Sequence, residues 1–320
     1  MFQEIVAESR PLKLFMSAIK SERTQYQYKY LLNRYLNHLG KLTYDDLLKD
    51  DPQTIQKNLE DYVMELGKHH TESAVRNQFS ALFLFFAMND VIINQIKLIK
   101  MFPIREQIGG GSAYSDKDIK SILNAIPTPK NRSRKIKRNV ALVHFFAASG
   151  CRVRAISGLE LKDLTRIENC YAVRVYARSM YEYTTFLTPE ATKALDDYHG
   201  SLNEILKEKG EEPLSQDFPI FNMNFEMIKK TMQRILKRAG IRIKSENGLY
   251  DIPVHHGFRK RFNTVLKSNN DINPNLIEMM LGHSTTIPLD QSYLKPTMER
   301  LFQEYKKGIE GLTINKRASL

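Results

Sequence analysis

Residues 256–262 read HGFRKRF, and this stretch says more about the fold than any other part of the chain. Positions three apart lie on the same face of a helix. In a helix, His256 and Arg259 therefore converge on one point, while Phe258 and Phe262 face the core. An imidazole beside a guanidinium suits a bound phosphate group. A His and an Arg at this spacing are also common by chance, so the motif must be judged with its neighbours.

A second arginine follows a glycine in residues 148–154, ASGCRVR. An apolar run ends at Gly150, which can turn the chain and leave Arg152 at a helix junction. A guanidinium there offers a planar fork of donors that matches phosphate oxygens and keeps its charge when partly buried. The alternative is an ordinary surface arginine that follows a helix.

A third motif, residues 280–284, reads MLGHS and places His283 directly after a glycine. Tyr293 follows in a short amphipathic segment that ends at Pro296. The chain has 15 tyrosines, and any one of them is ordinarily a half-buried packing residue. Its position after the Gly-His pair distinguishes Tyr293 as a candidate nucleophile.

The first hundred residues follow helical spacing, and a glycine run then interrupts the chain. Helices are expected over residues 54–66 and 73–88, and the second is apolar nearly all round, as in a buried helix of a bundle. Three glycines at 109–111 carry too much backbone entropy for a helix or strand. We therefore expect a helical domain at 1–108, a linker at 109–114 and a second domain at 115–320.

The second domain is predicted to be mixed. Ser115 with Asp118 resembles a helix cap that opens a helix over 116–125. Residues 170–187 alternate and are rich in Val, Tyr, Thr and Phe, which predicts a β-hairpin with its turn near 178–181. Residues 189–307 return to helical spacing. The expected fold class is mainly α with a small β-sheet.

The composition favours a nucleic-acid partner. Forty-eight Lys and Arg against 36 Asp and Glu give a formal charge of +12, which favours a polyanion. A basic run at 130–138 is either a solvated loop and helix start or an edge that contacts phosphates. No run approaches the roughly 18 apolar residues of a membrane span, and no signal-peptide core is visible, so a cytoplasmic protein without a membrane partner is expected. Cys151 and Cys170 are the only cysteines, and their spacing supports neither a disulfide framework nor a zinc site.

Taken in order, the three motifs and the tyrosine resemble the signature of the tyrosine recombinase, or phage-type integrase, family. The resemblance covers residues 149–293 and includes the Leu-rich stretch GLELKDL at 158–164. The N-terminal part is similar to the family's helical core-binding domain, which makes the second part its mixed α/β catalytic domain. The resemblance implies that Tyr293 forms a 3′-phosphotyrosyl link to DNA at a phosphate held by Arg152, His256, Arg259 and His283.

The resemblance also implies the partners. The two domains are expected to close around double-stranded DNA, with a homotetramer assembled on the DNA and a monomer as the alternative in free solution. The setting is the nucleoid of a prokaryotic cell, with a cellular or viral gene as its source. The phosphotyrosyl link conserves bond energy, so we expect no cofactor and no metal.

Two positions depart from the family pattern. The family usually carries a glutamate three residues after the first arginine, where this chain has Ala155. The family's hairpin lysine, the general acid for the leaving 5′-oxygen, has no counterpart in residues 171–187. Arg178 lies near its place, but a guanidinium with a pKa above ~12 is a poor proton donor. A catalytically weak or silent DNA-binding protein of the same fold, or an enzyme similar to type IB topoisomerases, therefore stays open as an alternative.

Overall fold

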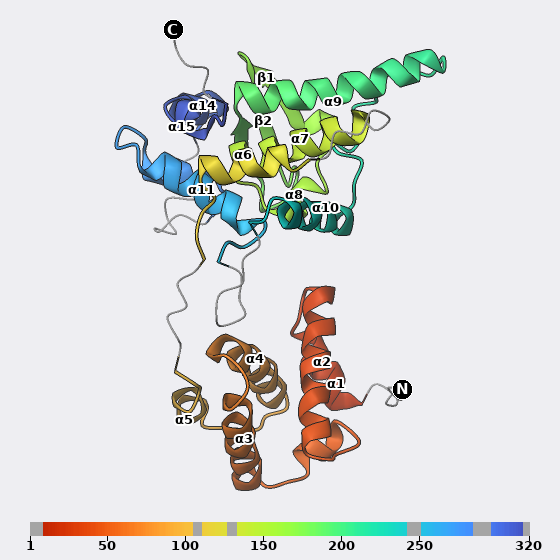
Figure 1. Ribbon diagram of the computed structural model, residues 1–320. Helices are drawn as coiled ribbons and strands as arrows, with labels where there is room; N and C mark the ends of the chain where they lie inside the picture. The colour runs from red at the N-terminus through yellow and green to blue at the C-terminus, as the bar shows by residue number, and fades with distance from the viewer. Residues whose placement is uncertain (1–8, 105–110, 127–132, 242–250, 284–295, 316–320) are drawn as a thin grey trace. The chain divides into compact units, whose positions relative to one another are not determined.

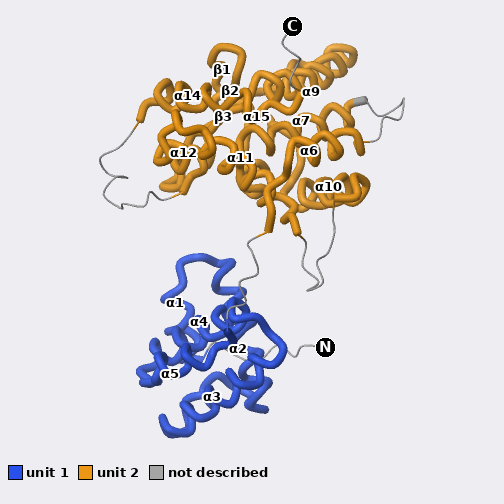
Figure 2. The backbone as a smooth tube through the Cα atoms, turned by 60° about the vertical axis from the view of Figure 1, so that its left-hand side comes forward, with its two compact units in different colours: residues 1–108 blue, residues 109–320 orange. Residues whose placement is uncertain are grey.

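The chain divides into two compact units, residues 1–108 and 109–320 (Figure 2). The computed structural model describes residues 9–104, 111–126, 133–241, 251–283 and 296–315. The first unit has one hydrophobic core, and the second has two.

The first unit is a bundle of helices. Its elements are α1 (Arg10–Ser17), α2 (Glu22–His38), the 3-10 helix η1 (Asp45–Leu48), α3 (Pro52–Gly67), α4 (Glu72–Met88) and α5 (Gln95–Lys100) (Figure 1). The side chains of Ser21, Asp51 and Thr71 accept backbone N–H groups at the starts of α2, α3 and α4, which satisfies donors that a helix start leaves free. Helix α4 packs on α1, α2 and α3. The two helices expected at 54–66 and 73–88 are confirmed as α3 and α4.

The second unit combines many helices with a small sheet. It contains α6 (Asp116–Asn124), α7 (Ser133–Ser149), α8 (Val153–Ile156), the 3-10 helix η2 (Leu161–Asp163), β1 (Leu164–Ile167), β2 (Cys170–Val175), β3 (Tyr183–Leu187), α9 (Pro189–Glu208), α10 (Phe225–Arg238), α11 (His256–Lys267), α12 (Pro274–Met280), α14 (Met298–Lys306) and α15 (Ile309–Leu312). The predicted capping box of Ser115 and Asp118 opens α6. The expected fold class, mainly α with a small sheet, is confirmed.

The sheet is antiparallel in the order β1-β2-β3 and is covered on both faces. Alternate residues of a strand point to opposite faces. Val173, Val175 and Leu187 accordingly join the core around α7 and α9, whereas Ala172 and Phe186 join the core around α12 and α14. The predicted hairpin is confirmed as β2 and β3. Strand β1 was not predicted, because it has only four residues and no buried one among them.

The described part of the expected linker belongs to the second unit. The Ser112 N–H donates to the carbonyl oxygen of Asp251 at 2.7 Å, and the Tyr114 N–H donates to that of Gly257 at 3.3 Å. Tyr114 is almost fully buried and packs on Phe258. The segment at 111–114 is thus tied to α11 and to the residues just before it.

The remaining expectations concern the cysteines, the basic run and membrane-spanning helices. Cys151 and Cys170 are both free and buried, as small apolar residues would be. Of the basic run at 130–138, residues 130–132 lie outside the described residues, and the remainder forms the first turns of α7. Among the helices of the described ranges, none is long and apolar enough to span a membrane.

Candidate active site

Helix α11 carries the HGFRKRF motif and divides it between core and surface. Phe258 and Phe262 are fully buried, as the spacing predicted, and Arg259 is only 7% exposed. His256, the first residue of the helix, is exposed. Gly257 has no room for a side chain, since a Cβ there would lie 2.5 Å from the Ile252 side chain. The helix start is therefore packed tightly while its histidine stays accessible.

The Arg259 guanidinium joins all three motifs. Its Nη1 donates to the carbonyl oxygen of Gly150 at 2.9 Å, and its Nη2 donates to that of Leu281 at 2.5 Å. Nη2 also lies 2.6 Å from Nε2 of His283. A guanidinium has five donors and no acceptor, so one side chain can fix several segments at once. Residues more than one hundred positions apart are thereby held at one point.

Both motif glycines are required by their surroundings. Gly150 and Gly282 have φ angles of +60° and +62°, a region that other residues rarely adopt. A Cβ on Gly150 would lie 2.8 Å from the Phe262 ring, and one on Gly282 would lie 2.4 Å from the Tyr183 ring. Because these glycines have no side chain, the two turns pack closely against the core. Their carbonyl oxygens can then accept hydrogen bonds from the two arginines, Gly150 from Arg259 and Gly282 from Arg152.

Arg152 also binds a glycine turn of the site, and its charge acts on Arg259. Its Nη1 donates to the carbonyl oxygen of Gly282 at 3.3 Å, so Arg152 holds the glycine turn of the third motif, whereas Arg259 holds that of the motif containing Arg152. Within the described residues, the contacts of the two guanidinium groups are with backbone carbonyls, the His283 ring and the Tyr183 hydroxyl, none of which carries a negative charge at neutral pH. The pair of positive charges is therefore not neutralised by these contacts.

The pKa shifts at the site are consistent with concentrated positive charge. Burial lowers the pKa of Arg259, and the nearby charge of Arg152 lowers it further. Burial also lowers the pKa of His256, with the charges of Arg259 and Arg152 as the next causes. A neighbouring positive charge disfavours a protonated imidazole. His256 is thus held neutral at neutral pH, beside two cations that can bind an anion.

His283 is placed by a residue that the sequence analysis missed. Its Nδ1 lies 2.5 Å from Oε2 of Glu278, and its ring is 38% exposed. Glu278 belongs to α12, five positions earlier, and its other oxygen accepts from Lys267. A glutamate inside a helix carries no recognisable signal in a sequence, because i,i+5 is not a standard helical pair.

The tyrosines near the site differ in burial. Tyr293 lies outside the described residues, so its position relative to the arginines stays a prediction. Tyr305 is fully buried and donates its hydroxyl proton to the carbonyl oxygen of Ala148 at 3.0 Å. Tyr183 is nearly buried beside Cys151. Burial raises the pKa of both Tyr183 and Tyr305, and their buried hydroxyl groups contact Cys151 and the Ala148 carbonyl.

The two departures from the family pattern lie beside one cavity. Ala155 is buried within α8 and lines a cavity of about 360 Å³. Arg178, in the β2–β3 turn, lines the same cavity with a φ of +64°. The other lining residues are Arg154, Gly158, Glu160, Lys162, Asp163, Arg174, Tyr176 and Ala177. Ala155 and Arg178 therefore line the same cavity, although they are 23 positions apart in the sequence.

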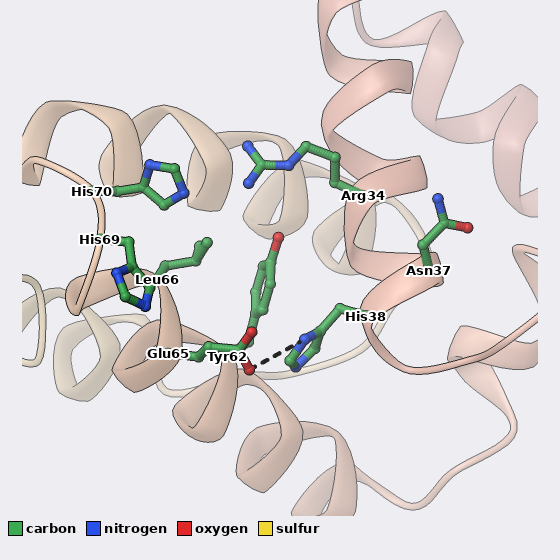
Figure 3. A pocket seen from close by; sticks show the side chains of 8 residues that line it. All are labelled: Arg34, Asn37, His38, Tyr62, Glu65, Leu66, His69 and His70. Carbon is green, nitrogen blue, oxygen red and sulfur yellow. Dashed lines mark ion pairs between the residues drawn. The ribbon is translucent and has the colours of Figure 1, made fainter.

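The first unit has a polar cavity of its own, of about 390 Å³. It is lined by the ends of α2 and α3 and by the residues that follow α3, namely Arg34, Asn37, His38, Tyr62, Glu65, Leu66, His69 and His70. Figure 3 shows the Arg34 guanidinium, the Tyr62 hydroxyl and the His70 ring directed toward the same space. Glu65 pairs with His38 at 3.5 Å. Within the described residues, Arg34 forms no ion pair with a lining carboxylate.

Comparison with known proteins identifies the class. The phage integrase family matches residues 114–300. The Tn1549 transposon integrase in complex with transposon right-end DNA has a TM-score of 0.60 at 14% identity, covering 93% of this chain and 98% of that one. XerH recombinase in its post-cleavage complex with palindromic difH has a TM-score of 0.57 at 17% identity, covering 94% and 92%. A lambda integrase dimer bound to a COC′ core site has 0.57 at 14% identity, covering 89% and 93%. A search of curated proteins by sequence gives no significant match.

The family match spans more than half of the chain and contains all the motif residues. This chain belongs to the phage integrase family of tyrosine recombinases.

Proposed function

We propose that this protein is a site-specific DNA recombinase that cuts and rejoins strands through a 3′-phosphotyrosyl intermediate on Tyr293. The observation that carries the proposal is the convergence of Arg152, Arg259 and His283 at one point. Within the described residues, neither guanidinium group has a hydrogen bond to a carboxylate. A scissile phosphodiester supplies the anion that this arrangement suits.

The two arginines stabilise the transition state in this proposal. Negative charge on the non-bridging oxygens grows as the phosphorus becomes five-coordinate, and fixed donors aimed at that charge each contribute several kcal/mol. Arg259 is buried and held by two carbonyls, so its orientation is set before DNA binds. Preorganisation of this kind is what lowers a barrier rather than merely tightening binding.

Tyr293 must lose a proton to attack, because an unperturbed tyrosine has a pKa of about 10. His256 is the proposed acceptor or phosphate donor. Its pKa is lowered by burial and by the two arginines, so the ring is neutral and has a free lone pair at neutral pH.

The proton for the leaving 5′-oxygen needs a donor other than a hairpin lysine. Lys260 is a candidate, because its charge contributes to the lowered pKa of His256 and it therefore lies within electrostatic range of the site. Its Nζ donates to the carbonyl oxygen of Gly111 at 2.5 Å. DNA binding would have to release Lys260 from that carbonyl before it could protonate the oxygen.

Double-stranded DNA is the proposed partner of both units. The structures of the Tn1549 integrase, XerH and lambda integrase were each determined with DNA. In the first unit, Arg34 at its cavity and the exposed rings of Tyr26 and Tyr30 on α2 are proposed backbone contacts. We further propose a homotetramer on DNA and a cytoplasmic location, where nucleoid DNA is accessible. Affinity should fall steeply with salt, as counterion release requires.

The decisive experiment uses a suicide DNA substrate, whose cut product diffuses away and traps the covalent complex. The wild type should give a protein band shifted by the attached strand on a denaturing gel, with or without EDTA. Tyr293→Phe should abolish that band while DNA binding persists. Tyr305→Phe is the matched control and should still form the adduct.

The same assay separates the alternatives. If the wild type forms no adduct on any cognate substrate, the protein is a silent DNA-binding member of the family. If it relaxes supercoiled DNA without preference for a sequence, the type IB topoisomerase reading is favoured. Arg152→Ala and Arg259→Ala should lose cleavage and keep most of the DNA affinity; equal losses in both would make these arginines ordinary DNA contacts.

A further inference from the structure

A chain of four side chains runs from the surface to the buried arginine of the site. Lys267, whose side chain is 40% exposed, donates to Oε1 of Glu278 at 2.5 Å. The other oxygen of Glu278 lies 2.5 Å from Nδ1 of His283. On the far side of the ring, Nε2 of His283 lies 2.6 Å from Nη2 of Arg259. Glu278 is thus the only carboxylate among these four side chains.

The Arg259 guanidinium and the Glu278 carboxylate determine which ring nitrogen of His283 carries the proton. A guanidinium can only donate, so Nε2 of His283 must accept and carry no proton. A neutral imidazole then carries its proton on Nδ1, where the Glu278 carboxylate accepts it. The hydrogen bond made by one ring nitrogen commonly sets the state of the other.

We infer that Glu278 is a positioning residue that holds His283 in the Nδ1-protonated tautomer, with Nε2 turned toward Arg259. The carboxylate fixes the ring plane, and the ring fixes one edge of the guanidinium. The consequence for cleavage rests on the proposed function, whereas the tautomer itself does not. Carboxylates that orient a histidine in this way are known to matter in other active sites.

A simpler role is also open to Glu278, because its ion pair with Lys267 ties α12 to the end of α11. The two roles use different oxygens, which allows them to be separated. Lys267→Ala removes the tie and leaves the His283 contact. Glu278→Gln keeps an acceptor for Nδ1 but removes the charge, and Glu278→Ala removes both contacts.

A matched control is available at the other end of α12. Glu304 of α14 accepts the backbone N–H of Asn273, the N-cap of α12, at 2.9 Å. Glu304→Ala therefore loosens the docking of α12 without touching His283. A general loss of α12 packing would affect this variant and Glu278→Ala alike.

The first experiment is ¹⁵N NMR of full-length protein labelled at histidine, at about pH 8, where an ordinary histidine is neutral. His283 signals are assigned by their loss in His283→Asn. Wild type, Lys267→Ala and Glu304→Ala should show a protonated Nδ1 and an unprotonated Nε2. Glu278→Gln should retain this pattern. In Glu278→Ala no carboxylate holds the ring plane, so the ring can turn away from Arg259 and a mixture of tautomers is expected. An unchanged Nδ1-protonated signal in Glu278→Ala would overturn the inference.

The second experiment measures single-turnover cleavage and DNA affinity for the same variants. Removing a residue that orients another typically lowers activity roughly 10- to 100-fold. Glu278→Ala should lose that much cleavage rate at unchanged DNA affinity, with a smaller loss in Glu278→Gln. Cleavage in Glu278→Ala equal to that in the wild type would overturn the catalytic part. A wild type that shows the tautomer but never cleaves would instead contradict the proposed function and leave the positioning role intact.

Discussion

His255 gives the stability of the second unit a defined dependence on pH. Its ring lies against Phe146, with centroids 5.2 Å apart, and neither ring nitrogen has a hydrogen-bond partner among the described residues. Burial, with the charges of His256 and Lys229, lowers its pKa from the ordinary 6.5 to about 4. The folded protein therefore keeps His255 neutral over a range in which the unfolded chain binds a proton.

The sign and size follow from this difference. The unfolded state binds more protons as the pH falls below 6.5, so the free energy of unfolding falls between pH 6.5 and about 4. The pKa of His255 falls from 6.5 to about 4, and each tenfold change in proton affinity corresponds to about 1.4 kcal/mol. His255 should therefore remove up to about 3 kcal/mol of stability across this range, as an order of magnitude.

The perturbation is His255→Phe, which keeps an aromatic ring beside Phe146 and cannot bind a proton. Its stability relative to the wild type should rise by up to about 3 kcal/mol as the pH falls from 7 to 4. Hydrogen exchange of peptides from α7, corrected for intrinsic rates, reports opening of the second unit separately. His69 of the first unit provides a control, since His69→Gln should leave the hydrogen exchange of α7 as it is in the wild type. Parallel pH dependences for the wild type and His255→Phe would refute the reasoning.

Three further predictions concern the site and its packing. Gly282→Ala adds a Cβ against the Tyr183 ring at a left-handed φ and should lower the free energy of unfolding by about 1–3 kcal/mol. Gly40 has the same kind of φ but open space around it, so Gly40→Ala should lose less stability. Thermal melting of both variants measures the difference. Tyr305→Phe removes a buried hydroxyl bond and should lose about 1 kcal/mol, with adduct formation on suicide DNA retained. In a plot of kcat/KM for cleavage against pH, the loss of activity in acid should have its midpoint below pH 6.5, because the pKa of His256 is lowered in the DNA-free protein. A midpoint above pH 6.5 would contradict His256 as the neutral base.

The sequence by itself determined the local elements and the order of the motifs. Ser115 and Asp118 predicted the start of α6 because capping depends only on residues three apart. The HGFRKRF spacing correctly placed Phe258 and Phe262 in the core, since helical periodicity is fixed by backbone geometry. The ordered motifs also predicted the family, whereas Tyr293 as the nucleophile remains a prediction from the sequence alone.

The tertiary structure decided how the motifs meet. That Arg259 binds the carbonyl of Gly150 could not be predicted, because the two lie 109 positions apart and backbone carbonyls carry no sequence signal. The same holds for Glu278, whose contact with His283 depends on the turn after α12. The sequence predicted a turn at Gly150, but only packing against Phe262 shows why no side chain fits there. Long-range contacts arise from the packing of whole elements, and residue type and local spacing do not encode them individually.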